Sequence, residues 1–177
     1  AAGGLSCTGS SIIEVVTVDP LPIITPGQSE VICSNEALNY TISTSNGLAG
    51  TTFTWPAPTL PAGVTGGSAR VAPSSNPIGD TFVNSTSSRQ VIVYQVTPFG
   101  PSALSCVGNT VNVQVYVDPL PDGTISIDQP VVCYGGNALL SFAMTVGTAP
   151  FEIVYNDGSS DITVSNMPQL SSEIFEG

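Results

Sequence analysis

The sequence has no lysine and no histidine, and its two basic residues are Arg70 and Arg89. Thirteen acidic residues give a net charge of −11 at pH 7. Proteins that bind nucleic acid or adsorb to anionic membranes need clustered cations, so both kinds of partner are excluded. Without lysine, a Lys–Asn isopeptide crosslink cannot form, and any covalent reinforcement must come from cysteine.

Catalytic patterns are also lacking. The carboxylates are scattered, no cysteine lies beside a base, and no glycine-rich phosphate loop joins a strand to a helix. We therefore predict that the chain is not an enzyme and holds no cofactor. No apolar run approaches the roughly 18 residues that cross a bilayer, so direct membrane insertion is not expected. The first seven residues do not resemble a signal peptide, and we expect any export signal to lie outside this sequence.

What the sequence does contain is an internal repeat. VDPLP occurs at 18–22 and again at 117–121, and each copy follows Ser-Cys-x-Gly and an alternating apolar run. The four cysteines keep the same register: Cys7 matches Cys106, and Cys33 matches Cys133. Self-similarity at a fixed period, here about one hundred residues, is typical of tandem repeats.

This period predicts the domain boundaries. Residues 1–19 are expected to be the C-terminal strand of a preceding repeat, 20–118 a complete repeat, and 119–177 the N-terminal part of a following one. Because each proline fixes its own φ and restricts the residue before it, two prolines around one leucine predict a stiff, extended connector whose leucine docks between repeats. The predicted linker residues are Asp19, Pro20, Leu21, Pro22, Asp118, Pro119, Leu120 and Pro121.

Alternation of apolar and polar residues predicts short β-strands. In the complete repeat they fall at 22–25, 36–44, 51–59, 67–73, 80–86, 89–98 and 109–119. Seven strands in about one hundred residues, with no amphipathic helix, predict an all-β immunoglobulin-like sandwich. The side chains expected to pack inside are Leu38, Tyr40, Ile42, Phe53, Trp55, Val91, Val93, Tyr94, Val111, Val113, Val115 and Val117. For Trp55 the alternative is a platform on which a sugar stacks.

The cysteines indicate disulfides, because there is neither a C-x-x-C spacing nor a histidine to complete a zinc site. Disulfides imply an oxidising, extracytoplasmic location. The favoured pair is Cys33 with Cys106, which would stabilise the repeat by about 4 kcal/mol, while Cys7 and Cys133 have partners outside the sequence. If Cys33 instead lies at the opposite end of the sandwich from Cys106, bridges between successive repeats are the alternative.

Two further kinds of site are hypotheses. Asp118, Asp122 and Asp128 could supply oxygen ligands for calcium beside the linker. An aspartate before proline also caps a turn, and no EF-hand spacing is present. Asn39 and Asn84 stand in N-x-S/T acceptor sequences for glycans. Of the two, Asn84 is expected at the surface, because Asn39 falls within a predicted strand.

Several stretches resemble a known family. They are VICSNE and VVCYGG after the linkers, SCVGNTVNVQVYVDPLP across the boundary, and GTAPFEIVYNDGSSDITVSNMP at 147–168. These resemble the PKD-like, immunoglobulin-like repeats of Bacteroidota cell-surface proteins, in particular gliding-motility adhesins exported by type IX secretion. The resemblance implies a long filamentous adhesin on the outer cell surface, with its secretion signal at the far C-terminus.

Two functions follow as hypotheses. The first is a structural repeat segment that sets the length and stiffness of an extracellular, cell-surface adhesin or filament, with neighbouring repeats of the same chain as its partners. The alternative is a ligand-binding module that recognises a polysaccharide or a surface protein through loops such as 56–67. Repetition with divergent loops favours the first.

Overall fold

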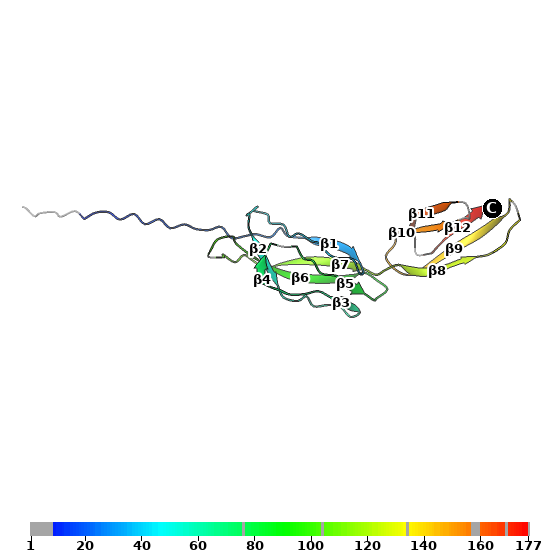
Figure 1. Ribbon diagram of the computed structural model, residues 1–177, viewed down its shortest axis with the longest axis horizontal. Coiled ribbons are helices and arrows are strands. Elements are labelled where there is room, and N and C mark those ends of the chain that lie inside the picture. The colour runs from blue at the N-terminus through cyan, green and yellow to red at the C-terminus, as the bar shows by residue number, and fades with distance from the viewer. Residues whose placement is uncertain are drawn as a thin grey trace, which may run out of the picture.

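Every element of the described chain is a β-strand (Figure 1). The computed structural model describes residues 9–75, 77–103, 105–133, 135–156, 160–168 and, by backbone alone, 170–176. The first seven strands are β1 (Ser29–Cys33), β2 (Thr52–Trp55), β3 (Val64–Gly66), β4 (Arg70–Ser74), β5 (Phe82–Asn84), β6 (Gln90–Phe99) and β7 (Val111–Asp118). The remaining five are β8 (Asp122–Ile127), β9 (Asn137–Val146), β10 (Phe151–Asn156), β11 (Asp161–Met167) and β12 (Leu170–Glu176).

Strands β1–β7 form a sandwich. Its regular layer has the order β1-β7-β6-β2-β4, in which β1 runs parallel to β7 and the other pairs are antiparallel. The facing layer consists of β3 paired with β5 and of segments that meet through single bridges. These bridges are Ile24 with Thr44, Ala37 with Thr81, and Tyr40 with Ile78.

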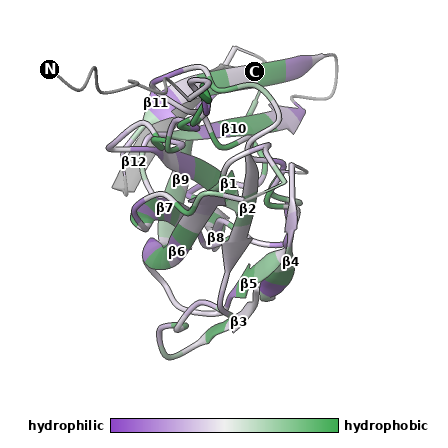
Figure 2. Cartoon of the chain, turned by 90° about the vertical axis from the view of Figure 1, so that its left-hand side faces the viewer, coloured by the Kyte–Doolittle hydropathy of each residue, from purple (hydrophilic) through white to green (hydrophobic). Residues whose placement is uncertain are grey.

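The core lies between these layers. Buried residues alternate with more exposed ones along β6 and β7, and Figure 2 colours these strands by hydropathy. The prediction that the alternating valines of β7 point into the core is confirmed for Val113, Val115 and Val117, which are 0% exposed. The inner residues of β6 are Ile92, Tyr94 and Val96. Other buried members are Ile24, Ile32, Leu38, Ile42, Phe53, Trp55, Val64, Ile78 and Phe82.

The predicted face of β6 was wrong in part. Val91 is 40% exposed and Val93 is half-buried, whereas Tyr94 is fully buried. Successive side chains of a strand point to opposite faces, so Val91 and Val93 cannot share the face of Tyr94. Two strands were not predicted at all. β1 buries only Ile32, and β3 lies inside the stretch 56–67 that was read as a loop.

Strands β8–β12 form a separate, smaller body with its own core. The sheet orders are β12-β9-β8 and β10-β11, and Phe142, Phe151 and Met167 are the buried residues. Figure 1 shows this body end to end with the sandwich, and shows residues 9–20 as an extended strand-free segment on the opposite side. In the described part of the chain, no helix is long and apolar enough to cross a membrane.

Candidate functional site

The two ends of the sandwich make different contacts. At the proximal end, Pro22 meets the turn that contains Cys106 and Gly108. At the distal end, β1 and β7 finish side by side, so that Cys33 is the strand partner of Asp118. From Asp118 the chain continues through three residues into β8. The distal end is therefore the junction with the second body.

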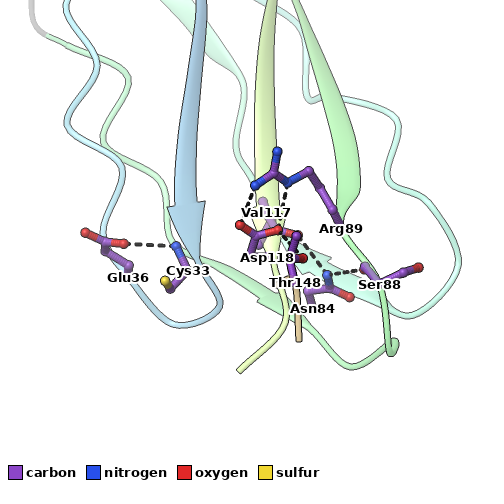
Figure 3. Close-up of polar contacts among 8 residues, drawn as sticks. All are labelled: Cys33, Glu36, Asn84, Ser88, Arg89, Val117, Asp118 and Thr148. Carbon is purple, nitrogen blue, oxygen red and sulfur yellow. Dashed lines mark hydrogen bonds and ion pairs between the residues drawn. The ribbon is translucent and has the colours of Figure 1, made fainter. Parts of the chain in front are cut away.

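Asp118 is the centre of this junction (Figure 3). Arg89 donates two hydrogen bonds to its carboxylate, from Nε to Oδ1 and from Nη2 to Oδ2, both 2.7 Å long. Thr148, which lies beyond β9 in the second body, donates from its hydroxyl to the same Oδ1 at 2.9 Å. The ion pair is partly exposed, at 41% for Arg89 and 18% for Asp118. One carboxylate thus ties β6, β7 and the second body together.

Asp118 also predicts a pH dependence of stability. The hydrogen bonds from Arg89 lower the pKa of the Asp118 carboxyl below its ordinary value of about 4, and Thr148 adds to the shift. A carboxyl whose pKa falls on folding stabilises the protein above its unfolded-state pKa and loses that contribution as the pH drops through the folded-state pKa.

We expect Asp118→Asn to cost about 0.2–1 kcal/mol at pH 7, because the pair is partly exposed. In urea unfolding, the gap between the variant and the wild type should shrink steadily below about pH 5. A gap that is constant with pH would contradict this.

Asn84 fixes the distal end from inside. Its side chain is 5% exposed and donates to the carbonyls of Ser88, at 2.9 Å, and Val117, at 2.8 Å. Its Oδ1 accepts hydrogen bonds from the backbone and hydroxyl of Thr86. The expectation that Asn84 is a surface glycan acceptor was therefore wrong, because every polar atom of its side chain is used within the fold. Asn39, by contrast, is exposed.

Residues 30–121 match the family model of the PKD-like domain, which covers β1–β7 almost completely and stops just before β8. The chain belongs to this family. No curated protein matches the chain. PKD-like domains are typically non-catalytic modules of extracellular or surface proteins, which agrees with a structural or adhesive role.

The predicted disulfide within the PKD-like domain was wrong. Cys33, Cys106 and Cys133 are free thiols, and Cys7 lies outside the described residues. Cys33 stands beside the end of β7, while Cys106 precedes its start. A strand of eight residues spans about 24 Å, whereas a disulfide needs Cα atoms within about 7 Å. The parallel pairing of β1 with β7 is what separates them.

The linker residues of the PKD-like domain are held by their prolines. Pro22 is fully buried and Pro119 is buried, whereas Leu21 and Leu120 are 56% and 51% exposed. The expectation that the linker leucine docks between bodies was therefore wrong for Leu120, which lies between the two described bodies, and it stays a prediction for Leu21. Asn46 holds the first linker from the side, donating to the carbonyl of Leu21 at 2.8 Å.

The three calcium candidates are not brought together. Both oxygens of Asp118 are taken by Arg89. Asp122 and Asp128 stand at opposite ends of β8, where they accept backbone hydrogen bonds from Gly123 and Leu139. Among the residues that the structure describes, no three Cys, Asp or Glu side chains are grouped as metal ligands.

Two hollows bear on the ligand-binding alternative. Trp55 borders one of ≈ 490 Å³ with Arg70 and Asp80, but its ring is only 4% exposed and its Nε1 donates to the Ser68 carbonyl. The Arg70 guanidinium lies 4.1 Å above the ring, so no face is free for a sugar. The other, of ≈ 260 Å³, lies between residues 56–59 and β6.

Proposed function

We propose that this chain is a segment of tandem PKD-like repeats in a bacterial cell-surface adhesin or filament, where it sets length and stiffness. The observation that carries the proposal is Asp118, whose carboxylate holds Arg89 of the sandwich and Thr148 of the second body at once. The two prolines of the linker restrict its backbone but do not by themselves fix how the two bodies are oriented. The contact through Thr148, together with buried Pro119, favours a defined angle.

The second body has features expected of another repeat. Thr124 of β8 pairs with Ala143 of β9, and one period earlier Ile24 bridges Thr44. The turn after each pairing contains a glycine with positive φ, at 58° for Gly47 and 117° for Gly147. These correspondences support a common framework for 20–118 and 119–177.

The segment before the PKD-like domain supports a preceding repeat. Residues 12–18 carry five large apolar side chains that are 83–92% exposed. In the repeat register Val16 and Val18 match Val115 and Val117, which are completely buried in β7. Such a stretch is stable in water when a neighbouring sheet covers it, which agrees with residues 1–19 being the last strand of a preceding sandwich.

The assignment to the cell surface, and to gliding adhesins in particular, rests on other support. Most PKD-like domains belong to extracellular or surface proteins, and a strongly acidic chain without lysine suits an exposed, non-sticky surface. The link to gliding adhesins and to type IX secretion rests on the sequence resemblance alone.

The proposal predicts that loss of the Thr148 hydroxyl loosens the junction. Thr148→Val keeps the shape of the side chain and removes one hydrogen bond, worth about 1 kcal/mol, or about fivefold in the ratio of docked to undocked bodies. Small-angle X-ray scattering should then show a shorter, broader distance distribution, with the unfolding of the PKD-like domain unchanged.

The matched control is Thr97→Val. The hydroxyl of Thr97 hydrogen-bonds to Thr110 at 2.8 Å within the domain and away from the junction. The scattering of the Thr97→Val variant should equal that of the wild type. If the wild-type chain itself scatters as a flexible pair of bodies, the stiff-segment function is wrong.

A further inference from the structure

The positions of the cysteines lead to a second proposal, which rests on the proposed function. We propose that successive repeats are joined by disulfides, each linking the counterpart of Cys33 in one repeat to the counterpart of Cys106 in the next. The bridge would cross the junction that Asp118 organises. It would lock the angle between repeats covalently.

Cys33 faces this junction. It is the last residue of β1, is exposed, and is the strand partner of Asp118, so the two backbones run about 4.8 Å apart. Its backbone N–H donates to Glu36 Oε2 at 2.9 Å, which fixes the turn that carries the thiol (Figure 3). The sulfur of Cys33 therefore stands at the distal surface of the sandwich, beside the residue that contacts the next body.

The next body approaches this point with residues 147–150. Thr148 bonds directly to Asp118, and a Cβ on Gly147 would lie 3.3 Å from the Cα of Pro121. The loop after β9 therefore lies against the linker and the end of β7.

In the PKD-like domain, the loop one period earlier lies against the turn of Cys106. A Cβ on Gly50 would be 2.9 Å from the Cβ of Pro101. Gly100 in turn donates to the carbonyl of Cys106 at 2.8 Å. If the second body continues as a full repeat, its own counterpart of Cys106 reaches the loop at 147–150. That position is next to Asp118, and so next to Cys33.

The same placement explains why the described cysteines are unpaired. Cys33 belongs to the junction after the PKD-like domain, and Cys106, at the proximal end, belongs to the junction before it. Cys133 lies between β8 and β9, at the end of the second body that points away from Pro121. Each of the three serves a different junction, so none has its partner within reach.

The oxidation needs an acceptor of two electrons. A small-molecule disulfide such as oxidised glutathione supplies it by thiol–disulfide exchange. One cysteine thiolate attacks the glutathione disulfide, forms a mixed disulfide and releases one glutathione thiol. The second thiolate attacks the cysteine sulfur of that mixed disulfide, forms the protein disulfide and releases the second glutathione. The two protein thiols lose their protons to solvent.

The test is a longer chain in which residues 20–118 are present twice, with 1–118 followed directly by 20–177. Because both linkers read VDPLP, the fusion keeps the native linker sequence, although Leu48 of the second copy takes the place of Thr148 opposite Asp118 of the first. After equilibration with oxidised and reduced glutathione, free thiols are alkylated and non-reduced peptides are mapped by mass spectrometry. We expect one bridge, between Cys33 of the first copy and Cys106 of the second.

Single substitutions tell the identical copies apart. Cys33→Ser in the first copy, or Cys106→Ser in the second, should abolish the cross-linked peptide. Cys106→Ser in the first copy and Cys33→Ser in the second should leave it intact. The original chain, under the same conditions, should be alkylated at all of its cysteines. Alkylation of first-copy Cys33 in the folded longer chain would overturn the proposal.

Scattering by the reduced original chain, which keeps the contact of Asp118 with Thr148, separates the two proposals. If the original chain is extended and stiff but the longer chain forms no bridge, only the disulfide proposal fails. If the original chain is flexible, the stiff-segment function fails, whether or not the bridge forms in the longer chain.

Discussion

Replacing Trp55 by alanine is expected to lower the free energy of unfolding of the PKD-like domain by about 3–5 kcal/mol, the usual cost of removing a large buried aromatic ring. The ring packs edge-on against Tyr94, with centroids 5.9 Å apart, and Tyr94 packs in the same way against Phe82. Truncation would leave a cavity at the centre of this aromatic cluster and an unpaired Ser68 carbonyl. Urea unfolding followed by far-ultraviolet circular dichroism measures the loss without relying on tryptophan fluorescence.

The control is Val71→Ala on β4, where the side chain is 88% exposed. Its effect should stay within about 0.5 kcal/mol, as is usual for surface positions. A loss below about 1 kcal/mol for Trp55→Ala would contradict the core role and would restore the sugar-platform hypothesis. The two interpretations of Trp55 therefore predict different unfolding free energies for Trp55→Ala, and this difference can be measured before any ligand is known.

The fold could be predicted where a strand buries a whole face. β7 carries four valines in alternation, and its bounds fall within the predicted stretch 109–119. β1 was missed because it buries a single residue, Ile32, and is held mainly by backbone pairing to β7. A sequence pattern records side chains that pack, and an edge strand with one buried side chain leaves almost no pattern.

The junction could be located from the sequence, but its chemistry could not. Asp118 was singled out for its place beside the linker, and calcium was the hypothesis for its role. The antiparallel register of β6 and β7 pairs Gln90 with Val117, which places Arg89 opposite Asp118. That register depends on how the turn between the strands closes, and no residue pattern specifies it. A carboxylate that already accepts two hydrogen bonds from a guanidinium has little left for a metal ion.

The cysteine pairing failed for a related reason. Spacing along the chain places Cys33 and Cys106 in one repeat, but only the topology shows that β1 carries Cys33 to the distal end. The alternative of bridges between repeats depended on that fact alone. Asn84 is a similar case, because the acceptor sequence for a glycan is local, whereas its burial depends on Val117, 33 residues away.

Replacing Gly108 by alanine is expected to destabilise the PKD-like domain by about 1–3 kcal/mol, the range for an added methyl group without room. A Cβ at this position would lie 2.1 Å from the carbonyl oxygen of Pro22 and 2.9 Å from Cγ of Pro98. The first contact is with backbone, so the linker itself must move. We therefore expect a second effect, a larger spread of linker orientations in small-angle scattering, because Pro22 loses its buried position. Urea unfolding measures the first effect.

Gly79→Ala is the matched control. The nearest atom to its added Cβ is the carbonyl oxygen of Leu38 at 3.9 Å, an ordinary contact, and its φ is not positive. Its stability and its scattering should both remain close to those of the wild type. Equal stability of Gly108→Ala and Gly79→Ala would mean that Pro22 does not rest on the turn of Cys106 in solution. Because that turn carries the thiol proposed to bridge to the preceding repeat, loosening it should also slow formation of the bridge in the longer chain. The absence of a side chain at Gly108 thus allows Pro22 to pack against the turn of Cys106, and the same turn positions the thiol for the proposed disulfide.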